Sequence, residues 1–139
     1  MNQVKLLSLT ETIKKYGLWA NKNFGQNYLL DLTITEQIAG LSGNLADVNV
    51  IEIGPGPGGL TRALLETAAK SVTVIEFDTR FIPALEELKS YYPERLNIIQ
   101  GDALKLPLHE LTPAPRAVIA NLPYNVATPI LFNLLDHIA

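Results

Sequence analysis

The chain has 139 residues, 47% of them hydrophobic and 18% charged, a composition typical of one folded domain and not of a disordered segment. It has no cysteine, which excludes disulfide bonds and thiolate metal sites, and it contains no apolar run of the roughly 18 residues that span a membrane. The net charge of −3 argues mildly against a nucleic-acid partner. The two histidines, His109 and His137, lack metal-ligand spacing, so we expect no metal. The absence of cysteines and of a membrane-length apolar run fits a cytoplasmic protein without membrane contact, which we also expect.

Residues 1–47 are predicted to form a helical arm in front of a sheet. Apolar residues at helical spacing predict a helix over 9–16, which Gly17 ends. The arm is basic, because four lysines and one glutamate precede residue 30; this face either contacts nucleic acid or is simply solvated. Segment 18–30 interleaves aromatic residues with lysines and asparagines, which suits either base stacking or packing of a loop. A capping box at 33–36 predicts a second helix.

A strand, a glycine turn and a helix are predicted next. The apolar run 50–53 stops at Gly-Pro-Gly-Pro-Gly-Gly (54–59), and helical spacing begins at Leu60. This is the first unit of an open α/β nucleotide-binding sheet. Three of the glycines fit the dinucleotide fingerprint, but the two prolines lack the N–H groups that would hold a pyrophosphate. Glu52, two residues before the first glycine, favours the S-adenosylmethionine form of this turn; a glycine-rich connection without a ligand is the alternative.

Three further strands are predicted, over 71–77, 96–100 and 116–120. A helix follows the first of them, a proline-rich loop separates the last two, and a final helix is predicted over 128–138. Right-handed crossovers place the strands in the order 3-2-1-4. This order brings four loop-tip residues to the carboxyl edge of the sheet, where such folds bind ligands: Gly54, Glu76, Asp102 and Asn121.

Glu76 ends the second predicted strand and is the candidate ligand for a ribose. It lies 22 positions after Gly54, close to the spacing expected for an acid that binds ribose hydroxyls. The alternative role for an acid at a strand tip is a helix cap, and Asp78 is the better candidate for that role.

The tetrapeptide Asn121-Leu122-Pro123-Tyr124 ends the fourth predicted strand and suits methylation of an amino group. The lone pair of an adenine 6-amino group is delocalised into the ring, so two acceptors aimed at its hydrogens would redirect that lone pair towards a methyl donor. The side-chain oxygen of Asn121 and the carbonyl of Leu122 are suited to this, and Tyr124 can stack on the base for about 1–3 kcal/mol. No general base is required. The alternative is a strand-end turn with a buried tyrosine.

Five motifs together resemble the small-subunit (16S) ribosomal RNA adenine dimethyltransferases of the KsgA type, over almost the whole chain. They are Phe24-Gly25-Gln26-Asn27-Tyr28-Leu29, Glu52-Ile53-Gly54-Pro55-Gly56, Val74-Ile75-Glu76, Gly101-Asp102-Ala103 and Asn121-Leu122-Pro123-Tyr124-Asn125. The resemblance implies a Rossmann-like, S-adenosylmethionine-dependent methyltransferase fold.

The resemblance also implies roles for particular residues. Asn27 and Leu29 would close over S-adenosylmethionine, and Gly54 would contact its methionine end. Glu76 would bind the ribose, Asp102 the adenine amino group, and Asn121 would lie beside the methyl group.

The implied activity is dimethylation of the 6-amino groups of two adjacent adenosines in small-subunit ribosomal RNA, within the pre-30S particle and by a monomer. Members of the family continue with three more strands and a small helical domain, whereas this chain stops at Ala139, inside the last predicted helix. We therefore expect residues 48–139 to be the first part of the methyltransferase domain, with its fourth strand left as an exposed parallel edge and the activity of these residues alone in doubt.

Four other functions stay open. A methyltransferase of large-subunit ribosomal RNA, of the macrolide-resistance type, shares several motifs, and a related tetrapeptide serves methylation of glutamine side chains in proteins. A ribosome-assembly factor that binds RNA without catalysis is a third alternative. A nicotinamide dehydrogenase would use the dinucleotide fingerprint.

Overall fold

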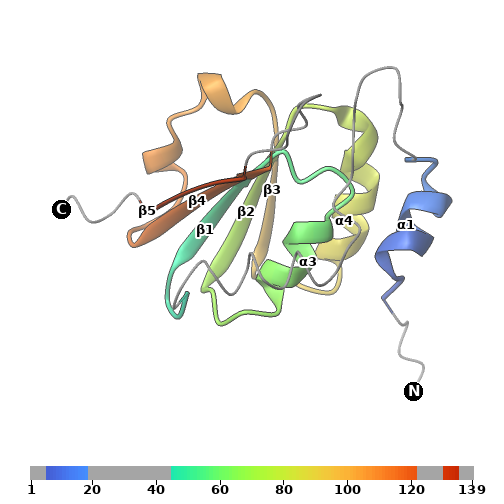
Figure 1. Cartoon of the computed structure of the whole chain (residues 1–139), viewed down its shortest axis with the longest axis horizontal. Coiled ribbons are helices and arrows are strands. Elements are labelled where there is room, and N and C mark those ends of the chain that lie inside the picture. The colour runs from blue at the N-terminus through green and yellow to red at the C-terminus, as the bar shows by residue number, and fades with distance from the viewer. Residues whose placement is uncertain (1–5, 19–44, 122–129, 135–139) are drawn as a thin grey trace.

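The computed structural model describes residues 6–18, 45–121 and 130–134. Its strands form one sheet in the order β3-β2-β1-β4-β5 (Figure 1). Strands β1 to β4 run parallel, and β5 runs antiparallel to β4. The strand bounds are β1 Asn49–Ile53, β2 Ser71–Glu76, β3 Leu96–Gln100, β4 Arg116–Asn121 and β5 Ile130–Leu134. The predicted order 3-2-1-4 is thus confirmed for the four parallel strands.

The prediction of a helix over 128–138 is wrong where the structure describes it, because Ile130–Leu134 forms β5. Asn121 pairs with Ile130, and Ala117 pairs with Leu134. A short apolar run fits a buried helix or a strand equally well, and the open edge of β4 offers a row of backbone groups that a strand satisfies. The expectation that β4 is an exposed edge is corrected by the same finding.

The helices described are α1 Leu9–Lys15, α3 Gly59–Leu65 and α4 Ile82–Lys89, with short 3₁₀ turns η2 Thr79–Phe81, η3 Ala103–Lys105 and η4 Leu108–Glu110. The first helix matches the prediction for 9–16 and begins with a capping box between Ser8 and Glu11. Pro83 lies in the first turn of α4, where its missing N–H is harmless. The helix predicted from the capping box at 33–36 lies outside the described residues.

The main core lies between the sheet and helices α3 and α4, which cover one face of it (Figure 1). Its fully buried side chains include Val50, Leu64 and Leu85. A smaller core on the other face packs Ile51 and Ile75 against residues of the loop that precedes β4. Within the described ranges, no helix is both long and apolar enough to cross a membrane.

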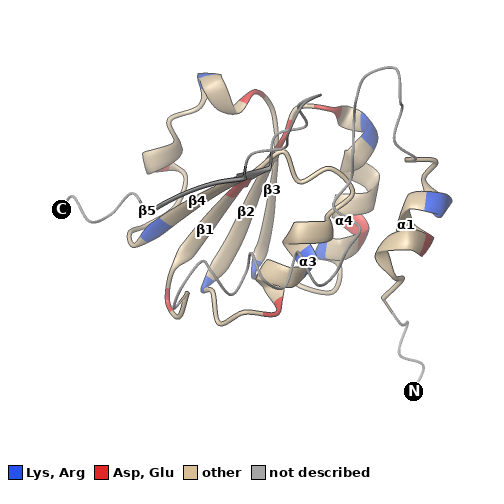
Figure 2. Cartoon of the chain, viewed as in Figure 1, with Lys and Arg blue, Asp and Glu red and all other residues tan. Residues whose placement is uncertain are grey.

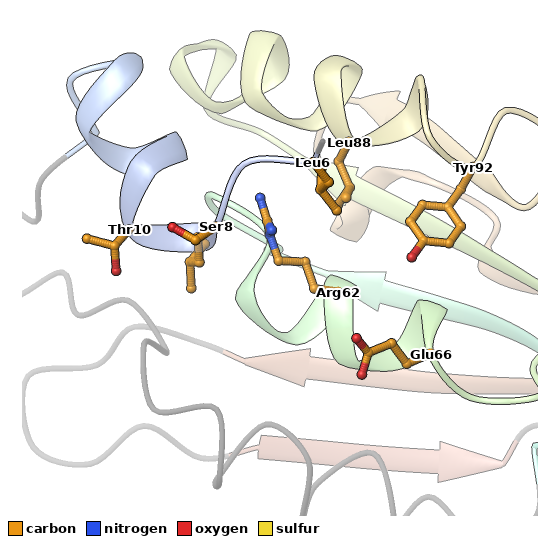
Figure 3. A pocket seen from close by; sticks show the side chains of 8 residues that line it. Leu6, Ser8, Thr10, Arg62, Glu66, Leu88 and Tyr92 are labelled. Atoms are coloured by element: carbon orange, nitrogen blue, oxygen red, sulfur yellow. The ribbon is translucent and has the colours of Figure 1, made fainter. Parts of the chain in front are cut away.

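Helix α1 is attached to the sheet domain by polar contacts with α3 and α4, and a small cavity that Arg62 lines lies beside the start of α1 (Figure 3). From α3, Arg62 donates to the carbonyl of Leu7 at 2.7 Å and to Oγ1 of Thr12 at 2.9 Å. From α1, the hydroxyl of Tyr16 donates to Glu87 Oε1 of α4 at 2.8 Å. The cavity, of about 250 Å³, lies between the start of α1 and the ends of α3 and α4. These contacts fix the point at which the N-terminal arm joins the domain.

Figure 2 marks both basic and acidic positions on the described elements. Two of the four lysines predicted to make the arm basic, Lys14 and Lys15, lie in the last turn of α1. Lys15 pairs with Glu87, so part of that basic charge is neutralised within the fold.

Candidate cofactor site at the carboxyl edge of the sheet

The turn between β1 and α3 has the backbone geometry that its glycines predict. Gly54, Gly56 and Gly58 have φ values of 71°, 56° and 99°, in the left-handed region that side chains disfavour. The N–H of Gly54 donates to the carbonyl of Ile75 at 3.0 Å, which extends the β1–β2 ladder by one bond. Gly58 then caps α3 without a side chain. The turn is therefore a compact, internally bonded connection in which Gly54 and Gly56 are half-buried.

Glu76 lies at the tip of β2 and binds this turn directly. Its Oε1 accepts the N–H of Gly56 at 2.9 Å, and its Oε2 accepts the N–H of Asp78 at 2.9 Å. The residue is only 6% exposed. Burial raises the pKa of the Glu76 carboxyl group, while the backbone N–H bonds from Asp78 and Gly56 oppose that shift. The carboxylate is thus held in one orientation beside the glycine turn.

The ends of β3 and β4 reach the same edge. The N–H of Gly101 donates to the carbonyl of Glu76 at 2.9 Å, so Asp102 lies one residue beyond a direct contact with β2. The carboxylate of Asp102 accepts the N–H of Leu104 at 2.9 Å and caps η3. Ile53 pairs with Ala120, so Asn121 is level with Gly54 on the neighbouring strand.

The structure therefore brings the backbone positions of all four predicted loop-tip residues to one edge. Asp78 caps η2 through a bond from the N–H of Arg80 at 2.9 Å, which confirms its predicted role as a cap. The predicted site residues Asn27, Leu29, Leu122 and Tyr124 lie outside the described residues. The ligand-binding roles assigned to all these residues stay predictions.

Two exposed apolar side chains flank the acids and were missed from the sequence. Phe77 follows Glu76 and is 72% exposed, and Leu104 lies two residues after Asp102 and is 95% exposed. Phe77 is the last residue of the strand predicted over 71–77, but β2 ends one residue earlier, at Glu76. A flat apolar ring beside a hydrogen-bonding carboxylate suits a ligand that has both a heterocycle and a sugar.

Glu52 is a second buried carboxyl group beneath the turn, and its environment was also missed. It is 1% exposed. Its Oε1 accepts the hydroxyl of Thr61 at 2.5 Å, and Oε2 has no hydrogen-bond partner among the described residues. Burial raises the pKa of Glu52 to about 8, against the opposing effect of the Thr61 bond, and the nearby charge of Glu76 adds to the rise. Glu52 is therefore neutral at pH 7.

Comparison with known proteins assigns the chain to a family. Residues 17–139 match the family model described as ribosomal RNA adenine dimethylase. The chain belongs to this family. Its S-adenosylmethionine-dependent, Rossmann-like methyltransferase fold agrees with the order of the parallel strands.

Curated relatives carry the name ribosomal RNA small subunit methyltransferase A. The protein from Gluconobacter oxydans is 57% identical over 132 residues, which are 95% of this chain and 44% of the relative. The protein from Afipia carboxidovorans is 56% identical over 138 residues, 98% of this chain and 49% of the relative. The chain thus spans about half the length of the curated relatives it matches.

Solved structures show the same architecture. The 23S rRNA methyltransferase ErmE is 34% identical with a TM-score of 0.61, over 72% of this chain and 39% of that one. A dimethyladenosine transferase from Plasmodium falciparum is 31% identical with a TM-score of 0.56, over 73% of this chain and 35% of that one.

The described residues fit S-adenosylmethionine, the cofactor of this family. The Glu76 carboxylate accepts backbone N–H groups on both of its oxygens, and because each carboxylate oxygen has two lone pairs, acceptor capacity remains for a ribose hydroxyl. The exposed ring of Phe77 offers an apolar face to an adenine. Gly54 and Gly56 have no side chain and positive φ values, which suits a turn that a ligand's methionine end approaches closely.

The buried carboxyl group of Glu52 predicts a specific dependence of stability on pH. Its pKa of about 8 in the folded state exceeds the ordinary value of 4.5, so the folded state binds more protons between these two values. The free energy of unfolding therefore falls as pH rises through this window, and this group contributes up to about 1.4 kcal/mol per pH unit to the fall. Above pH 8 the contribution of Glu52 no longer changes with pH. Glu52→Gln removes the titration, so its stability relative to wild type should rise from pH 5 to pH 8.

Urea unfolding of the intact protein at a series of pH values measures this difference. Glu66→Gln, the same change at an exposed position of the neighbouring helix end, is the matched control and should give a curve parallel to wild type. A Glu52→Gln curve that is also parallel to wild type would show that Glu52 is ionised in the folded protein.

Proposed function

We propose that the intact protein transfers methyl groups from S-adenosylmethionine to the 6-amino groups of two adjacent adenosines in small-subunit ribosomal RNA. The observation that carries the proposal is the placement of Asn121 level with Gly54, at the edge where Glu76 binds the glycine turn. It puts the residue suited to hold an amino group next to the turn suited to hold a methyl donor. The names of the curated relatives support the choice of the small subunit.

In this proposal the chain's own residues bind and align the reactants. Glu76 accepts hydrogen bonds from the ribose hydroxyls of the cofactor, and Asp102 accepts a hydrogen bond from its adenine amino group. Gly54 lies against the methionine end of the cofactor. The cofactor, when bound, supplies an electrophilic methyl group on a sulfonium. Asn121 and the carbonyl of Leu122 accept the two hydrogens of the target amino group, and Tyr124 stacks on the target base. Alignment and electrostatics provide the catalysis, and no side chain acts as a general base.

The partner in this proposal is the pre-30S particle in the cytoplasm, which the protein binds as a monomer without a metal. Among the described residues, no group of three or more histidine, aspartate or glutamate side chains is arranged to hold a metal ion. Half of the length of the curated relatives lies beyond the part matched by this chain, and we expect RNA contacts from that half as well.

A second candidate function is methylation of large-subunit ribosomal RNA. It is favoured by the similarity to ErmE, a 23S rRNA methyltransferase. Because both functions use the same reaction, they differ only in the RNA that is recognised.

Offering the intact protein tritiated S-adenosylmethionine with separate unmethylated small and large ribosomal subunits distinguishes the candidates. We expect label in the RNA of the small subunit, in dimethyladenosine after digestion. Label in large-subunit RNA would establish the second candidate, and label in ribosomal protein would contradict both. Cofactor binding without transfer to either subunit would favour a non-catalytic assembly factor.

The ribose assignment predicts a loss of cofactor affinity in Glu76→Gln. The amide keeps one oxygen for a backbone N–H but loses an acceptor for the ribose, so affinity should fall by about 1–3 kcal/mol, or roughly 5- to 150-fold. Isothermal titration calorimetry with S-adenosylmethionine measures the loss. Glu66→Gln, at an exposed position remote from the edge, should bind as wild type does. Unchanged affinity in Glu76→Gln would remove Glu76 from the site.

The acceptor role of Asn121 predicts that Asn121→Ala lowers turnover far more than cofactor affinity. Removing one group that aligns the amino group should cost about 10²-fold or more in rate, as removal of a single preorganised hydrogen-bonding group does in other enzymes. Single-turnover methylation and cofactor titration are measured on the same variant. Asn97→Ala on β3, which removes an exposed asparagine, should change neither quantity. Equal losses of rate and affinity would make Asn121 a cofactor-binding residue only.

A further inference from the structure

Glu52 has an oxygen atom for which the described part of the fold provides no partner. Oε1 accepts the hydroxyl of Thr61, whereas Oε2 is buried and makes no hydrogen bond to a described residue. Buried polar atoms in native proteins are nearly always hydrogen-bonded, so an unpaired carboxyl oxygen requires an explanation. Its surroundings suggest one.

Glu52 lies under the glycine turn on the same side of the sheet as Glu76. Its bond to Thr61 of α3 places it on the helix-covered face, to which Val50 and Val74 also belong. Glu52 pairs with Val74, and Glu76 lies two residues further along β2. With ordinary strand dimensions the Cα atoms of the two glutamates are about 8 Å apart. Glu52 thus lies on the strand next to that of Glu76, two residue positions further from the carboxyl edge of the sheet than the carboxylate proposed to bind the ribose.

The elements packed around Glu52 bring it no compensating positive charge within the described residues. The groups that act on its pKa are the hydroxyl of Thr61 and the carboxylate of Glu76. Arg62, the next residue of α3, is directed to α1 by its two hydrogen bonds there. On β4 the residue paired with Glu52 is Ile119. A cation bound at the turn would therefore bring this carboxyl group a positive charge that the described residues do not supply.

We propose that Glu52 exchanges a proton with solvent in response to the charge of the methyl donor. The carboxyl group is neutral in the free protein, loses its proton to solvent when the sulfonium donor binds, and regains it when the donor becomes a neutral thioether after transfer. The ionised form stabilises the donor complex more than the product complex. Glu52 thereby favours binding of S-adenosylmethionine and release of S-adenosylhomocysteine. This inference rests on the proposed function.

Proton release on binding is the direct readout. Isothermal titration calorimetry of the intact protein at pH 7, in two buffers of different ionisation enthalpy, gives the number of protons released for S-adenosylmethionine and for S-adenosylhomocysteine. We expect the charged donor to release about half to one proton more than the thioether, and Glu52→Gln to abolish this difference. Both ligands carry the same ribose, so a proton from Glu76 cancels between them. The amino groups of the ligands contribute equally in the two proteins.

The dependence of affinity on pH is the second readout. Between pH 6 and pH 8 the affinity for the donor should rise by up to tenfold per pH unit relative to the affinity for the thioether, and the ratio should be constant above pH 8. Thr61→Val keeps the carboxyl group and removes a bond that favours its charge, so it should move this profile to higher pH. Thr61→Ser restores a hydroxyl and should restore the profile, which a purely structural role of Thr61 would not require.

The outcomes separate this inference from the proposed function. If wild type binds neither ligand at any pH, the proposed function fails. If both ligands bind and release equal numbers of protons, with parallel pH profiles, the inference about Glu52 is overturned and the proposed function stands. If Glu52→Gln does not fold, the two Thr61 variants decide by whether their profiles shift.

Discussion

The hydrogen bond from the N–H of Gly56 to Glu76 is the contact on which the candidate site depends. It joins the glycine turn to the tip of β2, 20 residues further along the chain, at the point where the parallel ladder between β1 and β2 ends. Gly56 has a φ of 56°, and its N–H donates to the carboxylate at the tip of the neighbouring strand. The carboxylate is therefore oriented before any ligand binds, and little ordering is left to be done on binding.

The order of the predicted strands along the chain, together with the rule that crossovers between parallel strands are right-handed, was enough to predict much of the fold. The apolar runs located the four parallel strands, and right-handed crossovers then left one arrangement for them, which the sheet adopts. Local chemistry also located the cap at Asp78 and the helix that Gly17 ends. These features depend on neighbouring residues, so the sequence contains what is needed to predict them.

The features that the sequence did not predict depend on contacts between distant segments. Ile130–Leu134 has the spacing of a helix face, but its conformation is decided by the free edge of β4. The burial of Glu52 depends on packing against α3, and its bond to Thr61 closes only when that helix lies on the sheet. Phe77 belongs by pattern to a buried strand, and only the end of β2 at Glu76 turns it into exposed surface. In each case local pattern was compatible with two outcomes, and tertiary structure chose between them.

Helix α3 connects this corner of the sheet to the N-terminal arm through two adjacent residues. Thr61 bonds to Glu52 under the glycine turn, and Arg62 bonds to Leu7 and Thr12 of the α1 region. A helix is stiff over seven residues, so a displacement of the turn that moves Gly58 moves both contacts together. Leu18, after α1, and Leu45, before β1, are both buried in the core on this same helix side of the sheet. The buried carboxyl group of Glu52 and the start of α1 are therefore both held by one short helix, which begins at the glycine turn.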